Sequence, residues 1–160
     1  MNSMATIQLQ ETFFTDKEKT LVEHAGLTAT LFRYETGVCG VRLKNRRGQL
    51  VMLPFQGQQI WDCEFEGRTL TMQSMFRQPY ATKEYLGTYG AFFLHCGALT
   101  MGVPSKDDTH PLHGELPNAT YQKAYLQVGQ DERGAFLGLG GQYEHIVAFN
   151  PHYLFEAGVK

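Results

Sequence analysis

From Leu27 onward the chain alternates apolar and polar positions in short runs, and residues that favour turns separate these runs. The turn signals recur roughly every ten residues, a spacing typical of an antiparallel β-sandwich. The predicted strands cover residues 27–34, 38–43, 49–55, 60–65, 124–128, 136–139 and 143–149, and a further strand begins at residue 152. The pair Gly140-Gly141 predicts a turn between two of them. We therefore predict an all-β fold, a twisted antiparallel β-sandwich.

The first 26 residues carry a weaker pattern. Residues 1–26 predict either an outer strand or a loosely held arm. Within them, Asp16–Glu23 has the most helical pattern, but it is short and lacks a full apolar face, so we expect one turn of helix at most. No repeat or linker divides the chain, and its length suffices for one core. We expect a single domain over residues 1–160.

The stretch from Tyr85 to Gln122 interrupts the alternation and gathers polar side chains. An apolar run at 91–94 predicts a strand that leads directly into a histidine and a cysteine, and a long loop then ends in the run HPLHGE at 110–115. Loops carry chemistry while strands position it, so this arrangement predicts the floor of a pocket. The candidate site residues are His95, His110, His113, Glu115 and Asn118.

Several interpretations of this cluster stay open. His95, Cys96, His110 and His113 could together bind a metal ion, because imidazole and thiolate are zinc ligands, although their spacing does not fall on a predicted helix. His95 is equally well explained as a half-buried histidine at a strand end, and His110 as a residue that orders its loop. For Glu115 we favour a structural carboxylate over a base. Cys96 is most simply a small buried hydrophobe.

Charge and cysteine content restrict the partners. The formal net charge is −2, and no block of like charge occurs, which argues against nucleic acid or an anionic membrane as a partner. The short basic run at 44–47 is best explained as a hairpin turn. Three well-separated cysteines predict reduced thiols, and neither a signal peptide nor a membrane span is evident. We expect a cytoplasmic protein.

Two parts of the chain resemble the galactose mutarotase-like superfamily. Residues 53–76, LPFQGQQIWDCEFEGRTLTMQSMF, are similar to the opening of those proteins. The segment GAFFLHCG at 90–97, followed by HPLHGELPNA at 110–119, resembles the sugar-site motif of the aldose 1-epimerases, in which Leu-His-Gly follows a glycine-rich apolar strand. The likeness covers most of the chain and is nearest to a less characterised branch of the superfamily.

This resemblance implies a fold, a reaction and roles for residues. The fold would be a supersandwich that binds a sugar in a cleft and needs no cofactor. A base would remove the proton of the C1 hydroxyl while an acid protonates the ring oxygen, and the opened ring would rotate and reclose with the opposite anomer. His113 occupies the Leu-His-Gly position, which implies sugar binding and catalysis near the ring oxygen. Asn118 stands where the family places a polar residue. Tyr85 and Tyr89 are the best candidates for stacking on a sugar.

The chain also departs from the family pattern. Family members are much longer, and their second catalytic histidine and carboxylate base lie in the C-terminal half, whereas His145 and His152 have no matching motif around them. The resemblance therefore implies the N-terminal half of such a protein. Half of a sandwich would leave strand edges unpaired, so we expect self-association or a partner that completes the sheet. Two other functions stay open: a non-catalytic carbohydrate-binding or regulatory module, and a metal-dependent sugar isomerase.

Overall fold

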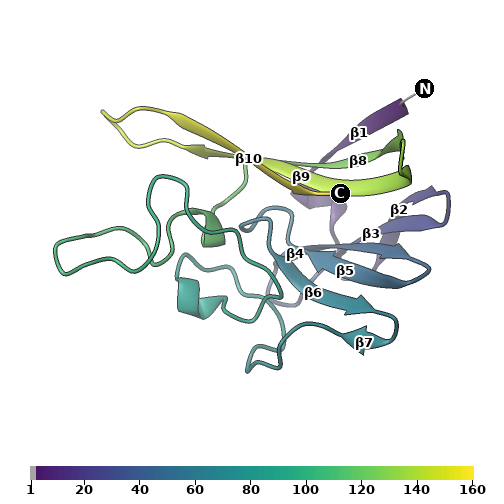
Figure 1. Ribbon diagram of the computed structural model, residues 1–160, viewed down its shortest axis with the longest axis horizontal. Helices are drawn as coiled ribbons and strands as arrows, with labels where there is room; N and C mark the ends of the chain where they lie inside the picture. Colours follow the sequence, from purple (N-terminus) through teal and green to yellow (C-terminus); the bar gives the residue numbers. More distant parts are fainter. Residues whose placement is uncertain (1–2) are drawn as a thin grey trace.

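Two antiparallel sheets face each other in the computed structural model, which describes residues 3–160 (Figure 1). The four-stranded sheet has the order β1 (Ser3–Leu9), β8 (Lys123–Asp131), β9 (Gly134–His145), β10 (Tyr153–Val159). The six-stranded sheet follows the sequence: β2 (Lys19–His24), β3 (Leu27–Arg33), β4 (Cys39–Asn45), β5 (Gly48–Met52), β6 (Ile60–Phe65), β7 (Arg68–Thr69). The prediction of an all-β antiparallel sandwich is confirmed.

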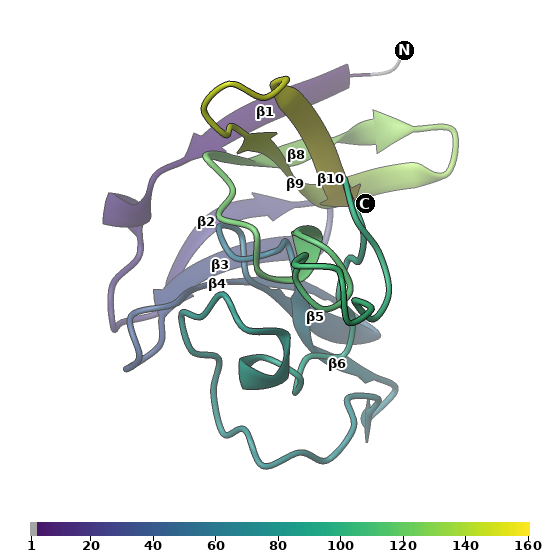
Figure 2. The same ribbon diagram turned by 90° about the vertical axis from the view of Figure 1, so that its left-hand side faces the viewer.

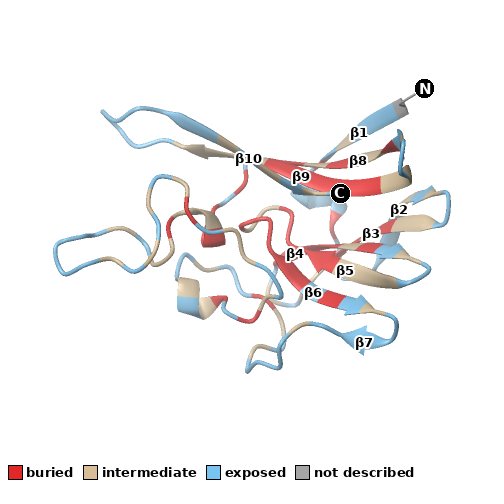
Figure 3. Ribbon diagram, viewed as in Figure 1, coloured by how far each residue is buried: buried red, intermediate tan, exposed pale blue. Residues whose placement is uncertain are grey.

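The main core lies between the two sheets (Figure 3). Successive side chains point to opposite faces of a strand, so the alternation in the sequence places one apolar set inward. Leu31 pairs with Val41 across β3 and β4, Leu126 pairs with Leu139 across β8 and β9, and all four are at most 2% exposed. Burial of each such side chain stabilises the fold by about 1.5–3 kcal/mol.

The outer face of the six-stranded sheet is covered as well. Phe32, Val51 and Trp61 alternate with the inward-facing residues and form a second apolar cluster, against which Phe76 packs from the connection between β7 and β8. The ring of Phe32 lies over its cross-strand partner Gly40, where a Cβ atom would come within 2.5 Å of the ring. The sheet is therefore buried on both sides at this end.

The N-terminal region contains two strands. β1 pairs with β8 at the edge of the smaller sheet, so the outer-strand alternative is correct for the described part, while residues 1–2 lie outside the described residues. Asp16–Glu23, for which one helical turn at most was expected, forms no helix, because the segment enters β2 and pairs with β3. Leu21 and Val22 pack against the main core, and this packing outweighs the weak local preference for helix. A short 3-10 helix, η1 (Glu11–Phe13), links β1 to β2.

Two strand predictions in the C-terminal part are also corrected. Gly140-Gly141 forms no turn, because β9 runs without interruption from Gly134 to His145. Gly140 instead allows a close approach: it pairs with Tyr125, whose ring would meet a Cβ atom there at 2.6 Å. The strand expected over 143–149 ends at His145, and a loop then leads to β10.

One long connection, residues 70–122, joins β7 to β8. It contains the short 3-10 helices η2 (Tyr85–Gly87) and η3 (Leu116–Asn118), and the strand expected at 91–94 is reduced to a single bridge between Phe93 and Ile60. The connection lies beside one end of the sandwich, where the β9–β10 hairpin extends over it (Figures 1 and 2). Connections of this length usually carry function. Among the described residues, no helix is long and apolar enough to cross a membrane.

Candidate functional site

A buried amide ties the long connection to the six-stranded sheet. Gln59 immediately precedes β6 and is fully buried. Its Nε2 atom donates a hydrogen bond to the carbonyl of Pro117 at 2.8 Å, and the hydroxyl of Thr88 lies 3.0 Å from Nε2 and 3.1 Å from Oε1. Thr88 is fully buried too. One side chain therefore fixes the segments around η2 and η3 relative to the sheet.

Glu115 holds a second part of the connection in place. Its carboxylate accepts hydrogen bonds from the N–H groups of Leu99 and Thr100 at 3.0 and 3.2 Å, and from the Thr100 hydroxyl at 2.8 Å. Burial by itself would raise the pKa of Glu115, but these hydrogen bonds outweigh it and hold the pKa below its usual value. Both carboxylate oxygens are engaged, so Glu115 is an ionised anchor of the loop.

The segments fixed by these two anchors border a pocket of about 580 Å³ with the end of β9. We call this the β9 pocket. Its walls come from the region before and within η2, from the segment that leads into η3, and from β9. The lining residues are Lys83, Glu84, Tyr85, Leu86, Pro111, Leu112, Gly114, Glu115, Asn118, Ala119, Tyr143 and His145.

Tyr143 and His145 form a hydrogen-bonded pair in the β9 pocket. They are two residues apart on a strand and therefore share a face, and the Tyr143 hydroxyl lies 2.8 Å from Nδ1 of His145. Burial, and then the negative charge of Glu115, raise the pKa of Tyr143. The phenol is therefore neutral near neutral pH and fixes the imidazole ring. When Nδ1–H donates to the phenol oxygen, Nε2 has a free lone pair that can accept a proton from a ligand, whereas when the phenol donates to Nδ1, Nε2–H is a hydrogen-bond donor.

Of the five predicted site residues, Glu115 and Asn118 line the β9 pocket. His113 is not among the described lining residues, and its ring centroid lies 4.6 Å from that of Tyr85, which does line the pocket. The main chain of His113 also holds the loop together, because its N–H donates to the carbonyl of Gly102 at 2.8 Å. The His113 imidazole thus packs against an aromatic side chain of the pocket wall, and its contact with a ligand stays a prediction.

His95 and His110 lie away from the β9 pocket. His95 was expected on a strand lining the cleft, but it lies in the loop with its ring edge-on to Phe93 at 5.0 Å, and burial lowers its pKa. His110 contacts the carbonyl of Pro111 through Nδ1 at 2.8 Å. Within residues 3–160 no three His, Cys, Asp or Glu side chains gather as a metal site would require, so the alternative of a metal ion bound by His95, Cys96, His110 and His113 finds no support.

Sequence reasoning missed Lys83, Tyr143 and His145 as lining residues. Tyr143 and His145 did carry a signal, because two hydrogen-bonding rings with a spacing of two at the end of a strand must face the same way. The sequence offers no comparable signal for Lys83, whose position follows from the path of the long connection.

The β9 pocket thus combines aromatic walls with a few convergent polar groups, the composition typical of sites for small polar molecules. Its volume also lies within the range of such sites. Comparison with known proteins attaches no family to this arrangement: no protein-family model, no curated protein and no solved structure matches the chain.

Proposed function

We propose that the chain is a carbohydrate-active domain that resembles the aldose 1-epimerases and binds a sugar in the β9 pocket. The observation that carries the proposal is the hydrogen-bonded Tyr143–His145 pair, which lines a pocket of about 580 Å³. The aromatic ring of Tyr85 belongs to the wall of the same pocket. A sugar offers hydroxyl groups that both donate and accept hydrogen bonds, and an apolar ring face that suits an aromatic side chain. Asn118 adds a further polar group at the wall.

His145 has the chemistry for one of the two proton transfers in anomer interconversion. In this role Nδ1–H of His145 donates to the Tyr143 oxygen, so Nε2 carries a free lone pair. Nε2 takes the proton of the C1 hydroxyl as the bond between C1 and the ring oxygen breaks, and the ring oxygen takes a proton from water, which becomes hydroxide. After rotation about the C1–C2 bond these transfers run in reverse. With water in place of a second protein group, the chain is an incomplete catalyst, slower than an enzyme with two positioned groups.

A non-catalytic carbohydrate-binding module is the second candidate, and the state of Glu115 favours it. Among the residues that the structure describes, Glu84 and Glu115 are the only carboxylates that line the β9 pocket, and both oxygens of Glu115 accept hydrogen bonds from the loop. His145 is the only histidine among the lining residues. These observations suit ligand binding without efficient turnover. A metal-dependent isomerase has no such support.

Binding and turnover can be measured separately. Saturation-transfer NMR with glucose and galactose reports binding, and polarimetry of freshly dissolved α-glucose reports the rate of mutarotation. We expect the wild-type chain to bind a sugar and accelerate mutarotation, and His145→Gln to lose the acceleration while it keeps binding. His152→Gln, at an exposed position outside the pocket, is the matched control. Binding without acceleration would select the module, and no saturation transfer from either sugar would refute both.

Self-association stays a prediction. β10 is an edge strand, and the loop between β9 and β10 exposes Ile146 and Phe149. Light scattering coupled to size-exclusion chromatography should show an assembly larger than one chain, and a monomer at all concentrations would contradict this. The cytoplasmic location also stays a prediction.

A further inference from the structure

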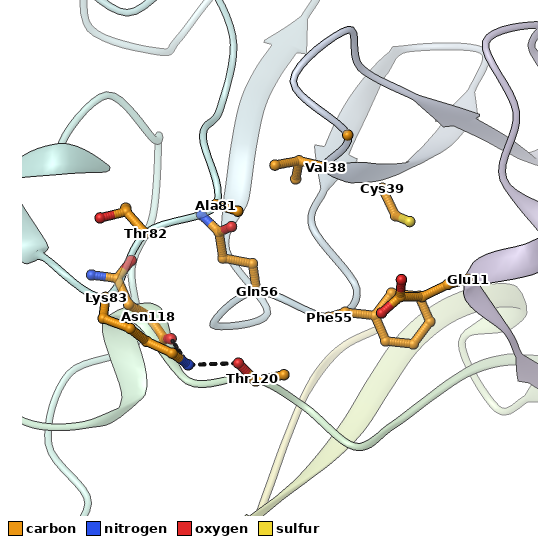
Figure 4. A pocket seen from close by; sticks show the side chains of 11 residues that line it. Glu11, Val38, Cys39, Phe55, Gln56, Ala81, Thr82, Lys83, Asn118 and Thr120 are labelled. Atoms are coloured by element: carbon orange, nitrogen blue, oxygen red, sulfur yellow. Dashed lines mark hydrogen bonds between the residues drawn. The ribbon is translucent and has the colours of Figure 1, made fainter.

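A second pocket, of about 420 Å³, shares a wall with the β9 pocket (Figure 4). Lys83 and Asn118 line both pockets, whereas Tyr143 and His145 line only the β9 pocket. We call the second one the Lys83 pocket. Its remaining lining residues are Glu11, Gly37, Val38, Cys39, Phe55, Gln56, Ala81, Thr82 and Thr120.

Lys83 and Asn118 line one end of the Lys83 pocket. The Lys83 ammonium donates to the Thr120 hydroxyl and to the main-chain carbonyl of Asn118, which fixes its position and leaves a third N–H for a ligand. Asn118 is only 7% exposed, and its known hydrogen bonds use its side-chain oxygen and its carbonyl. Its amide N–H groups are therefore free to donate as well. A cation held in place by two hydrogen bonds, in a pocket that an amide also lines, suits a carboxylate.

The opposite end of the Lys83 pocket is lined by apolar groups and one carboxylate. Val38, Cys39 and Phe55 line the pocket there, and Val38 and Cys39 are buried. Burial raises the pKa of Cys39 to about 11, so its thiol is neutral and behaves as a small apolar group. Glu11 lies next to Phe55, across the pocket from Lys83 and Asn118 (Figure 4). Its carboxylate disfavours a second anionic group at this end.

We propose that the Lys83 pocket binds a small monocarboxylate with an apolar body. The carboxylate lies against Lys83 and Asn118, and the apolar body lies against Val38, Cys39 and Phe55. Glu11 repels the second carboxylate of a dicarboxylate that would otherwise bind in this orientation. This site is separate from the sugar site of the proposed function, although the shared wall lets a ligand in one pocket affect the other.

Benzoate is the probe for this proposal, measured on the full chain by titration calorimetry and by chemical shifts of labelled protein, without sugar. We expect benzoate to bind and three comparison compounds to bind at least about tenfold more weakly. Acetate lacks the apolar ring, benzyl alcohol lacks the negative charge, and terephthalate carries a second carboxylate. Equal binding of benzoate and benzyl alcohol, or no benzoate binding at millimolar concentration, overturns the proposal.

Two pairs of variants locate the site. Lys83→Met should weaken benzoate binding by about tenfold or more, while Lys106→Met, also exposed, should leave it unchanged. Ala81→Trp should block the Lys83 pocket from an exposed position, and Ala148→Trp on the exposed β9–β10 loop is its control. Benzoate binding that survives Ala81→Trp overturns the proposal.

A variant that binds a ligand more tightly than wild type cannot owe this change to misfolding. Glu11→Gln should strengthen terephthalate binding towards that of benzoate, because it removes the repulsion at the apolar end, and a misfolded variant would gain nothing. Unchanged discrimination in this variant counts against the proposed orientation. Because no sugar is present and Tyr143 and His145 do not line this pocket, failure here leaves the sugar proposal intact, and failure of the sugar proposal leaves this one intact.

Discussion

Replacement of Gln59 by leucine should destabilise the fold because hydrogen bonds are lost, not because apolar packing is lost. Leucine has a similar size but makes no hydrogen bonds, so the hydroxyl of Thr88 and the carbonyl of Pro117 would lose their partner in the interior. Each buried polar group left unpaired costs about 1–3 kcal/mol. We expect a loss of about 2–6 kcal/mol, a large share of the 5–15 kcal/mol by which domains are typically stable.

A double-mutant cycle separates this mechanism from poor packing. Thr88→Val alone leaves Oε1 of Gln59 unpaired, whereas in the double variant neither partner of that hydrogen bond remains. The cost of the double variant should therefore be smaller than the sum of the two single costs by about 1–3 kcal/mol. Gln10→Leu, at an exposed position without a side-chain hydrogen bond to η1, is the control and should cost less than about 0.5 kcal/mol.

Urea unfolding followed by fluorescence gives these free energies. Trp61 is the only tryptophan and is 4% exposed, so its emission reports exposure of the outer cluster on the six-stranded sheet. The slope of the unfolding free energy against urea concentration should be the same in all variants. The midpoints of the urea transitions can then be compared directly as differences in stability. Additive costs within about 0.5 kcal/mol, with Gln59→Leu below about 1 kcal/mol, would refute the view that this amide anchors the connection.

Two further predictions concern ionisable groups. Because the folded-state pKa of Glu115 lies below the usual 4.5, its contribution to stability should be complete above that pH and disappear as the pH falls through the folded-state value. Urea unfolding at several acidic pH values should show a flatter decline for Glu115→Gln than for wild type or Glu132→Gln, and an identical decline would contradict the assignment. Iodoacetamide should modify exposed Cys96 first, because burial raises the pKa of Cys39 and Cys63, and peptide mapping should find no rapid labelling in Cys96→Ser. Rapid labelling that persists in this variant would disprove the burial of the other two thiols.

The sandwich was predictable because its strands follow a simple physical rule. A strand between a core and a second layer must alternate, and Leu31, Val41 and Leu139 occupy the positions that the alternation marks as inward. The errors arose where a residue type has two uses. Gly140 was assigned to a turn, yet glycine serves equally where a ring such as that of Tyr125 approaches the backbone.

The site was much less predictable, because it depends on the path of a connection with little regular structure. Residues 91–94 are apolar enough for a strand, but only Phe93 forms a bridge, and of the four residues only Ala91 packs against the outer cluster of the sheet. His95 therefore leaves the expected strand and the expected cleft. Glu115 and Asn118 do reach the β9 pocket, since both belong to the segment that Gln59 and Thr100 hold in place.

The Leu-His-Gly run has a structural explanation that does not depend on a sugar. Gly97 and Gly114 form a parallel bridge, and a Cβ atom at Gly114 would lie 2.3 Å from the carbonyl of Thr100. His113 adopts a φ of 62°, a left-handed conformation that a non-glycine residue holds at a cost of about 1–3 kcal/mol. The loop therefore demands glycine at position 114 whatever binds nearby, and the ring of His113 lies against that of Tyr85. The weight of the carbohydrate proposal consequently rests on Tyr143 and His145, which the resemblance did not mark.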